Sequence, residues 1–118
     1  MIAESNIQKL VDVFADATHK HHEALMEGNS RKANKQAKRV ADTFQAIITT
    51  GDMARQALLQ LTKSEDMAVA STAATFSLKY ATDESIAVLK RVAQRTDLLG
   101  FRAEQALKRW EEGSWHLE

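Results

Sequence analysis

Apolar residues recur every three or four positions along most of the chain, with polar or charged residues between them. This spacing places the apolar side chains on one face of an α-helix. Short clusters of Gly, Asn, Asp and Ser interrupt the pattern, and these residues favour turns and helix caps. The pattern therefore predicts six helices, at residues 6–27, 30–49, 53–62, 67–80, 84–95 and 99–112.

The apolar faces of these helices define a predicted core. The two long helices contribute Ile7, Leu10, Val11, Phe14, Ala17, His21, Leu25, Ala33, Ala37, Val40, Ala41, Phe44, Ile47 and Ile48. The four shorter helices contribute Met53, Ala57, Leu58, Leu61, Val69, Ala70, Ala73, Phe76, Tyr80, Ile86, Leu89, Val92, Ala93, Leu99, Ala103, Ala106, Leu107 and Trp110. Residues 68–75 are almost all small, which allows neighbouring helices to approach closely.

The breaks between the helices predict how the helices pair. Two residues, Gly28 and Asn29, join the long helices, so residues 6–50 are expected to form an antiparallel hairpin. Residues 52–117 are expected to form two shorter hairpins. The other predicted caps are Ser5 or Asn6, Asp52, Asp66, Thr82 with Asp83, and Gly113. The predicted fold is all-α, a HEAT-repeat-like stack of helical hairpins in a single domain over residues 1–118.

Composition supports a helical chain and narrows its function. Pro and Cys are absent and Gly occurs four times, which leaves few turn residues for a strand-rich fold and no thiol chemistry. Sixteen basic and sixteen acidic residues give a net charge of zero, unlike most dedicated nucleic-acid-binding domains. No stretch approaches the roughly 18 apolar residues of a membrane span, and the N-terminus lacks the pattern of a signal peptide. A cytoplasmic protein is predicted.

A further set of residues has the spacing of a known family. The set is Leu58-Leu59-x-Leu61, Asp66, Val69, Ala73-Ala74, Leu89, Ala106, Trp110 and Gly113-x-Trp115, preceded by Ala24-Leu25-x-x-Gly28-Asn29 and Asn34. In these positions the chain resembles a bacterial HEAT-like domain of unknown function, numbered twenty-nineteen. The resemblance implies an all-helical HEAT-like fold with no known activity. Small proteins of this kind are often immunity proteins, encoded beside a toxin that they neutralise.

The chain departs from the HEAT-like pattern at one position. Such repeats usually have an Arg after the Val of the second helix, where it ties neighbouring turns together. Ala70 occupies that place in this chain. The second unit of the repeat has Arg102 there, so the resemblance assigns the role to Arg102.

Two helix faces of opposite charge are candidate binding surfaces. The acidic face of helix 6–27 comprises Asp12, Asp16, His19, Glu23 and Glu27. The basic face of helix 30–49 comprises Arg31, Lys32, Lys35, Lys38 and Arg39. The acidic face would suit a basic partner, and the basic face an acidic protein or, less well, a nucleic acid, because no aromatic residue is present there to stack bases. A solvated surface is the simpler explanation of each face.

Aromatic residues and histidines provide the remaining candidates. Phe101 lies off the apolar face of its helix, so it fills a gap, the simpler explanation, or is exposed for a partner. Trp115 either closes the end of the core or contacts a partner. His19, His22 and Glu23 have spacings that can bind zinc, but Met26 replaces the second His of an H-E-x-x-H motif. Because only His116 could supply a distant ligand, no metal site is predicted.

The sequence favours a non-enzymatic protein-binding module, most concretely a bacterial immunity protein that binds and neutralises a toxin. The alternative is a regulatory scaffold that binds a small ligand or a nucleic acid. No catalytic residue, cofactor or membrane contact is predicted, and the expected state is a monomer or a weak homodimer. The predicted partner-binding residues are Asp12, Asp16, His19, Glu23, Glu27, Phe101, Arg102 and Trp115, with Arg31, Lys35 and Lys38 on the basic face.

Overall fold

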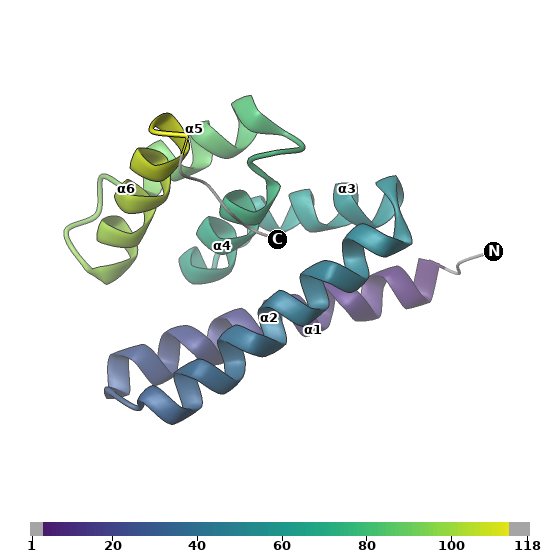
Figure 1. Cartoon of the computed structure of the whole chain (residues 1–118), viewed down its shortest axis with the longest axis horizontal. Coiled ribbons are helices and arrows are strands. Elements are labelled where there is room, and N and C mark those ends of the chain that lie inside the picture. The colour runs from purple at the N-terminus through teal and green to yellow at the C-terminus, as the bar shows by residue number, and fades with distance from the viewer. Residues whose placement is uncertain (1–3, 114–118) are drawn as a thin grey trace. The chain divides into compact units, whose positions relative to one another are not determined.

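The computed structural model describes residues 4–113, which form six α-helices and a short 3-10 helix, with no strand among them (Figure 1). The helices are α1 (Glu4–Glu27), α2 (Ser30–Thr50), α3 (Asp52–Gln60), η1 (Leu61–Lys63), α4 (Met67–Ser77), α5 (Thr82–Val92) and α6 (Leu98–Glu111). The all-α prediction is therefore confirmed. None of the described helices combines the length and the apolar character needed to cross a membrane.

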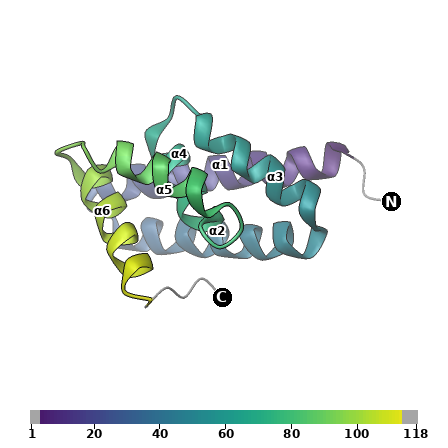
Figure 2. The same cartoon turned by 90° about the horizontal axis from the view of Figure 1, so that it is seen from above.

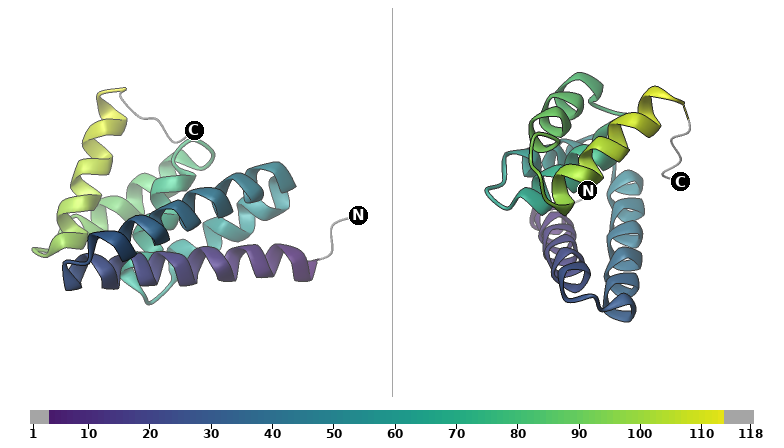
Figure 3. Two further views of the ribbon diagram at one scale, coloured as in Figure 1. Left: turned by 60° about the horizontal axis from the view of Figure 1, so that its bottom comes forward. Right: turned by 90° about the vertical axis from the view of Figure 1, so that its left-hand side faces the viewer.

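The chain divides into two compact units, and the boundary lies between Leu61 and Thr62. In the first unit, α1 and α2 lie side by side and antiparallel, and α3 packs against both (Figure 2 and Figure 3). Each of the three helices contributes a fully buried side chain, namely Phe14, Ile47 and Leu58.

The predicted break between the two long helices is confirmed. Gly28 has a φ of 71°, a left-handed conformation that suits glycine at the end of a helix. The side-chain oxygen of Asn29 then accepts a hydrogen bond from the backbone N–H of Lys32 at 3.0 Å, which caps the start of α2. Two residues are therefore sufficient to reverse the chain.

The helix α3 belongs with the hairpin that precedes it. The sequence grouped residues 52–117 as two short hairpins, which would pair this helix with α4. In the structure α3 packs on α1 and α2, and its buried residues are Ala54 and Leu58, one turn apart. A single residue, Gly51, joins α2 to α3 with a φ of 117°. The grouping of the whole chain as a single domain stays a prediction.

In the second unit, α4, α5 and α6 pack against one another. Their shared core contains Ala74, Leu78, Leu89 and Val92. The small residues predicted to allow close helix packing are indeed buried on α4. Gly100, in the first turn of α6, permits a second close approach, because a Cβ atom there would overlap the carbonyl oxygen of Arg95.

Four residues predicted to lie in the core are exposed: Met53, Tyr80, Ala37 and Ala41. Met53 is 63% exposed because the buried face of α3 begins one residue later. Tyr80 is 42% exposed because α4 ends at Ser77, after which the helical period no longer applies. The two alanines are exposed because the buried face of α2 is rotated away from them, towards Thr43.

Several predicted helix caps are wrong, whereas the cap at Asp66 is confirmed. The wrong ones are Ser5 or Asn6, Asp52, and Thr82 with Asp83. Helix α1 already begins at Glu4, and Asp52 and Thr82 are the first residues of their helices rather than the residues before them. The carboxylate of Asp66 accepts hydrogen bonds from the backbone N–H groups at the start of α4, at 3.0 and 3.3 Å.

Candidate functional site

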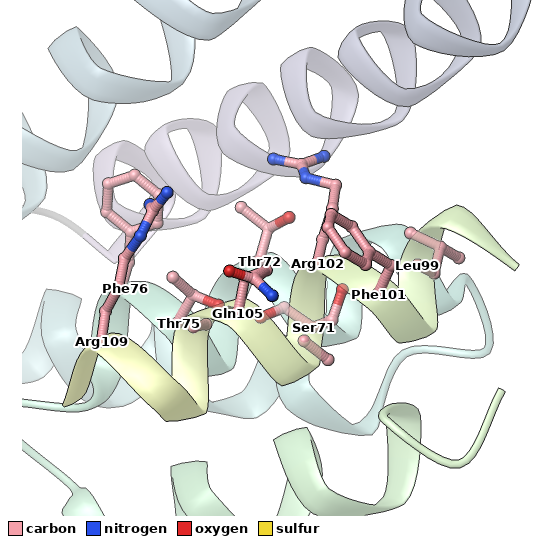
Figure 4. A pocket seen from close by; sticks show the side chains of 11 residues that line it. Ser71, Thr72, Thr75, Phe76, Leu99, Phe101, Arg102, Gln105 and Arg109 are labelled. Atoms are coloured by element: carbon pink, nitrogen blue, oxygen red, sulfur yellow. Dashed lines mark hydrogen bonds between the residues drawn. The ribbon is translucent and has the colours of Figure 1, made fainter. Parts of the chain in front are cut away.

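A groove of about 230 Å³ lies between α4 and α6 of the second unit (Figure 4). The residues that line it are Ser71, Thr72, Thr75 and Phe76 of α4, and Leu99, Phe101, Arg102, Ala103, Gln105, Ala106 and Arg109 of α6. Figure 4 shows Phe76 and Arg109 towards one end of the groove, and Leu99, Phe101 and Arg102 towards the other. All the lining residues belong to one unit.

Phe101 is the most exposed aromatic side chain among residues 4–113, with 59% of its surface accessible. The helix places it there because Leu99, Ala103 and Ala106 form the buried face of α6. Phe101 is two positions from both Leu99 and Ala103, which turns it away from that face. The explanation that Phe101 fills a gap is therefore wrong, and the side chain is exposed.

Two arginines, Arg102 and Arg109, lie seven positions apart on α6 and both line the groove. Arg102 forms no hydrogen bond or ion pair with any of the residues 4–113, so the bridging role that the resemblance assigns to it is not seen there. Partial burial of its guanidinium group lowers the pKa of Arg102, although the residue as a whole is exposed. The group stays charged, because a guanidinium group is not deprotonated in proteins.

Asp97 fixes the start of α6 next to the groove. Its side chain accepts a hydrogen bond from the backbone N–H of Gly100 at 3.2 Å, which caps the helix. It also forms an ion pair with Arg95 at 2.6 Å. The hydrogen bond from Arg95, followed by that from Gly100, lowers the pKa of Asp97. The same pair raises the pKa of Arg95.

The groove lining offers apolar contact, hydrogen-bonding groups and two cations. The hydroxyl groups of Ser71 and Thr75 already donate to backbone carbonyls of α4, at 3.3 and 2.9 Å. No histidine, carboxylate or cysteine is among the lining residues, so neither hydroxyl has a general base beside it in the groove. The groove therefore offers apolar side chains, an amide and two guanidinium groups for contact with a ligand.

The two charged faces predicted in the first unit meet each other within the chain. Asp16 of the acidic face pairs with Arg39 of the basic face at 2.9 Å, and with Lys20 at 3.1 Å. The hydrogen bonds from Arg39 and then Lys20 lower the pKa of Asp16. The charges of Asp16, Lys20 and Arg39 are therefore used inside the unit.

Other charged residues of these faces also have neighbours of opposite sign. His19 lies 3.5 Å from Glu23, and Lys38 pairs with Asp42 at 2.7 Å. A crevice of about 330 Å³ between α1 and α2 has a lining of mixed charge, namely Lys20, Glu23, Ala24, Glu27, Lys32, Lys35 and Gln36. Asp12 accepts a hydrogen bond from Gln8 at 2.8 Å, and Arg31 is exposed. The lining of this crevice therefore combines cations and carboxylates.

The histidines on α1 do not gather with other ligands. Among the residues that the structure describes, no three His, Asp or Glu side chains are placed so that they could hold a metal ion. The Nδ1 atom of His22 is buried and has no hydrogen-bond partner. His116 and Trp115, which the sequence also singled out, lie outside the described residues.

Of the residues that line the groove, the sequence pattern indicated only Phe101 and Arg102 as binding residues. Arg109 had a signal, because a residue seven positions after Arg102 lies on nearly the same helix face. Thr72, Thr75 and Phe76 of α4 had none. They line the groove only because α4 packs against α6, a pairing that the periodicity of a single helix does not reveal.

The chain is similar to one solved structure, the crystal structure of the protein RPA1889 from Rhodopseudomonas palustris CGA009. The match has a TM-score of 0.85 at 22% sequence identity and covers 93% of this chain and 92% of that chain. This likeness shows the fold alone. No family model matches the chain, and no curated protein has significant similarity to it. The resemblance to the HEAT-like family therefore stays a prediction.

Proposed function

We propose that this protein is a non-enzymatic protein-binding module that engages its partner through the groove between α4 and α6. The observation that carries the proposal is the exposure of Phe101 at one end of that groove, beside Arg102, which has no ion pair with any of the residues 4–113. Aromatic residues, Phe among them, and arginine are enriched in protein–protein interfaces relative to the rest of the protein surface. An exposed Phe on a helix whose other apolar residues are buried or half-buried gains most from being covered by a partner.

The size of the groove favours a protein partner over a small ligand. Its volume of about 230 Å³ is below the roughly 300 to 1,000 Å³ of most small-molecule sites. The basic face of α2 gives little support to a nucleic-acid-binding scaffold, because Arg39 and Lys38 pair with carboxylates of the same chain. A salt titration with mixed DNA and RNA tests this alternative, since phosphate binding would appear at low salt and weaken steeply as salt rises.

In its most concrete form, the partner is a bacterial toxin that the protein neutralises in the cytoplasm. This form rests on the resemblance to HEAT-like domains, among which small immunity proteins are common. The protein would act by binding and covering a surface of the toxin. In this complex the toxin lies against α6, with Phe101 as the apolar anchor and Arg102 as the charged contact.

Co-expression with the product of the neighbouring gene tests the proposal. We expect the two proteins to purify together and the growth inhibition caused by that product to disappear. Phe101→Ala should lose both effects, whereas Met53→Ala, which removes a similarly exposed side chain from the first unit, should keep them. Unrelieved growth inhibition with no co-purification would contradict the immunity role. Equal effects of the two variants would contradict the role of the groove.

A further inference from the structure

We infer that the groove between α4 and α6 recognises an acidic segment of a partner protein, with carboxylates on either side of an apolar side chain. The inference rests on the proposed protein-binding function and adds the chemistry of the partner. Three features of the second unit carry it: the charge of the groove, the spacing of its two arginines and the apolar side chains of its lining.

The charge of the lining has a single sign. Arg102 and Arg109 are its only charged residues, so a bound segment meets two cations and no anion. Arg102 has no carboxylate partner among residues 4–113, unlike Arg39 and Arg95, which are both paired with Asp. Its guanidinium group is also partly removed from water, which strengthens attraction to a carboxylate because the local dielectric is lower. A planar guanidinium binds a carboxylate through two parallel hydrogen bonds.

The spacing of the arginines sets the spacing of the carboxylates. Seven helical residues separate their Cα atoms by about 10 Å along α6. Acidic residues seven positions apart on a helix of the partner have the same separation, so such a helix could lie along α6 and place one carboxylate beside each arginine. Each flexible Arg side chain also allows shorter or longer spacings.

The large apolar side chains of the lining lie at the ends of the groove, and small residues lie between them. Phe76 and Phe101 lie at opposite ends of the groove, and the small hydroxyl residues Ser71, Thr72 and Thr75 lie between them. Small residues leave the space there, and a volume of about 230 Å³ accepts an apolar side chain rather than a whole helix. Gln105 can hydrogen-bond to the polar atoms of the segment, because its amide both donates and accepts. A Leu, Ile, Met or Phe flanked by acidic residues matches this surface.

A random peptide library displayed on phage is a suitable probe, selected against the full chain. We expect enriched peptides to carry Asp or Glu on both sides of a large apolar residue. Selection against the double variant Arg102→Glu/Arg109→Glu should lose the acidic preference. The charge-matched control Lys90→Glu/Lys108→Glu, at exposed positions of α5 and α6 outside the groove lining, should keep it. All four positions are exposed, so both variants should melt like the wild type.

A second measurement needs no variant of the protein. Replacing the acidic residues of an enriched peptide by Asn or Gln should weaken its Kd at least about tenfold, because each charge-assisted hydrogen bond is strong. The affinity of the unmodified peptide should also fall as salt is raised.

The outcomes separate this inference from the proposed function. Enriched peptides without an acidic preference, or a preference that the double variant keeps, would overturn the acidic segment and leave the proposed function standing. If no peptide is enriched but a partner co-purifies, the acidic segment is likewise overturned and the proposed function still stands. No enrichment and no co-purification would overturn both. Binding of mixed DNA, or self-association in sedimentation, that the double variant abolishes would assign the groove to phosphates or to a second copy and overturn the inference.

Discussion

The two long helices of the first unit and the groove of the second differ in how their charged side chains are paired. In the first unit, carboxylates and cations from α1 and α2 pair across the hairpin or along one helix, as Asp16 does with Arg39 and Lys20. In the second unit, the groove between α4 and α6 has two arginines and no carboxylate in its lining. The longer runs of charge in the sequence therefore lie in the unit where part of that charge is paired internally, whereas the exposed Phe101 lies next to Arg102 in the other unit.

The hairpin also explains why the two charged faces look like binding surfaces in the sequence but are partly neutralised in the structure. A long antiparallel hairpin brings two helices of opposite charge together, so their edges can neutralise each other. The three short helices of the second unit leave a groove with an uncovered Phe101 instead. Four predictions, ordered from the largest expected effect to the smallest, test how far the two units differ.

The largest effects should come from emptying each core. Phe14→Ala should lower the free energy of unfolding by about 3–5 kcal/mol, and Leu89→Ala by about 2–5 kcal/mol, because both side chains are fully buried. Urea unfolding measures the loss, and amide hydrogen exchange locates it. We expect faster exchange mainly in α1–α3 for Phe14→Ala and mainly in α4–α6 for Leu89→Ala. Equal loss of protection across the whole chain for either variant would contradict two separate units.

Gly100→Ala should destabilise the second unit by about 1–3 kcal/mol, because the added Cβ must displace the backbone at Arg95. Thermal unfolding measures this loss, and Lys108→Ala, an exposed change on the same helix, is the control and should have almost no effect. A melting temperature that is the same for Gly100→Ala and for the wild type would show that this contact does not fix the start of α6.

Replacing Asp97 should make stability depend differently on pH. Its hydrogen bonds from Arg95 and Gly100 lower the pKa of Asp97 below the ordinary value of 3.8 in the folded state. A carboxylate with a lowered pKa stabilises the folded state above its unfolded pKa, and this contribution is lost as the pH falls through the folded pKa. Asp97→Asn should therefore melt below the wild type at neutral pH, and the gap should close well below pH 3.8. If the difference in melting temperature stayed constant well below pH 3.8, the carboxylate of Asp97 would not stabilise the folded state in this way.

The smallest effect should come from Asp16→Asn in the first unit. Its partners Lys20 and Arg39 lie at the surface, where water and salt weaken the attraction. We expect a slightly lower melting temperature, with the difference disappearing at high salt. A larger fall in melting temperature than that of Asp97→Asn would contradict this prediction. It would mean that the surface ion pairs of α1 and α2 hold the hairpin together.

Local pattern predicted most of the fold, and long-range packing decided the rest. The periodicity placed all six helices, and Phe14, Leu58 and Leu89 were assigned correctly to the core. Tyr80 was misplaced because nothing in the local pattern marks the end of α4 at Ser77. The groove could not be predicted as a whole, because Phe76 and Arg109 approach only through the packing of α4 on α6.

The most direct test of the account compares one cation from each unit. The Kd of an acidic peptide enriched by the wild-type chain should be measured by titration calorimetry for Arg102→Glu in the groove and Lys35→Glu on the basic face of α2. The account predicts that Arg102→Glu raises the Kd at least about tenfold, whereas Lys35→Glu leaves it within about twofold, because only Arg102 would meet the peptide in the groove. The reverse result, a loss with Lys35→Glu alone, would contradict it.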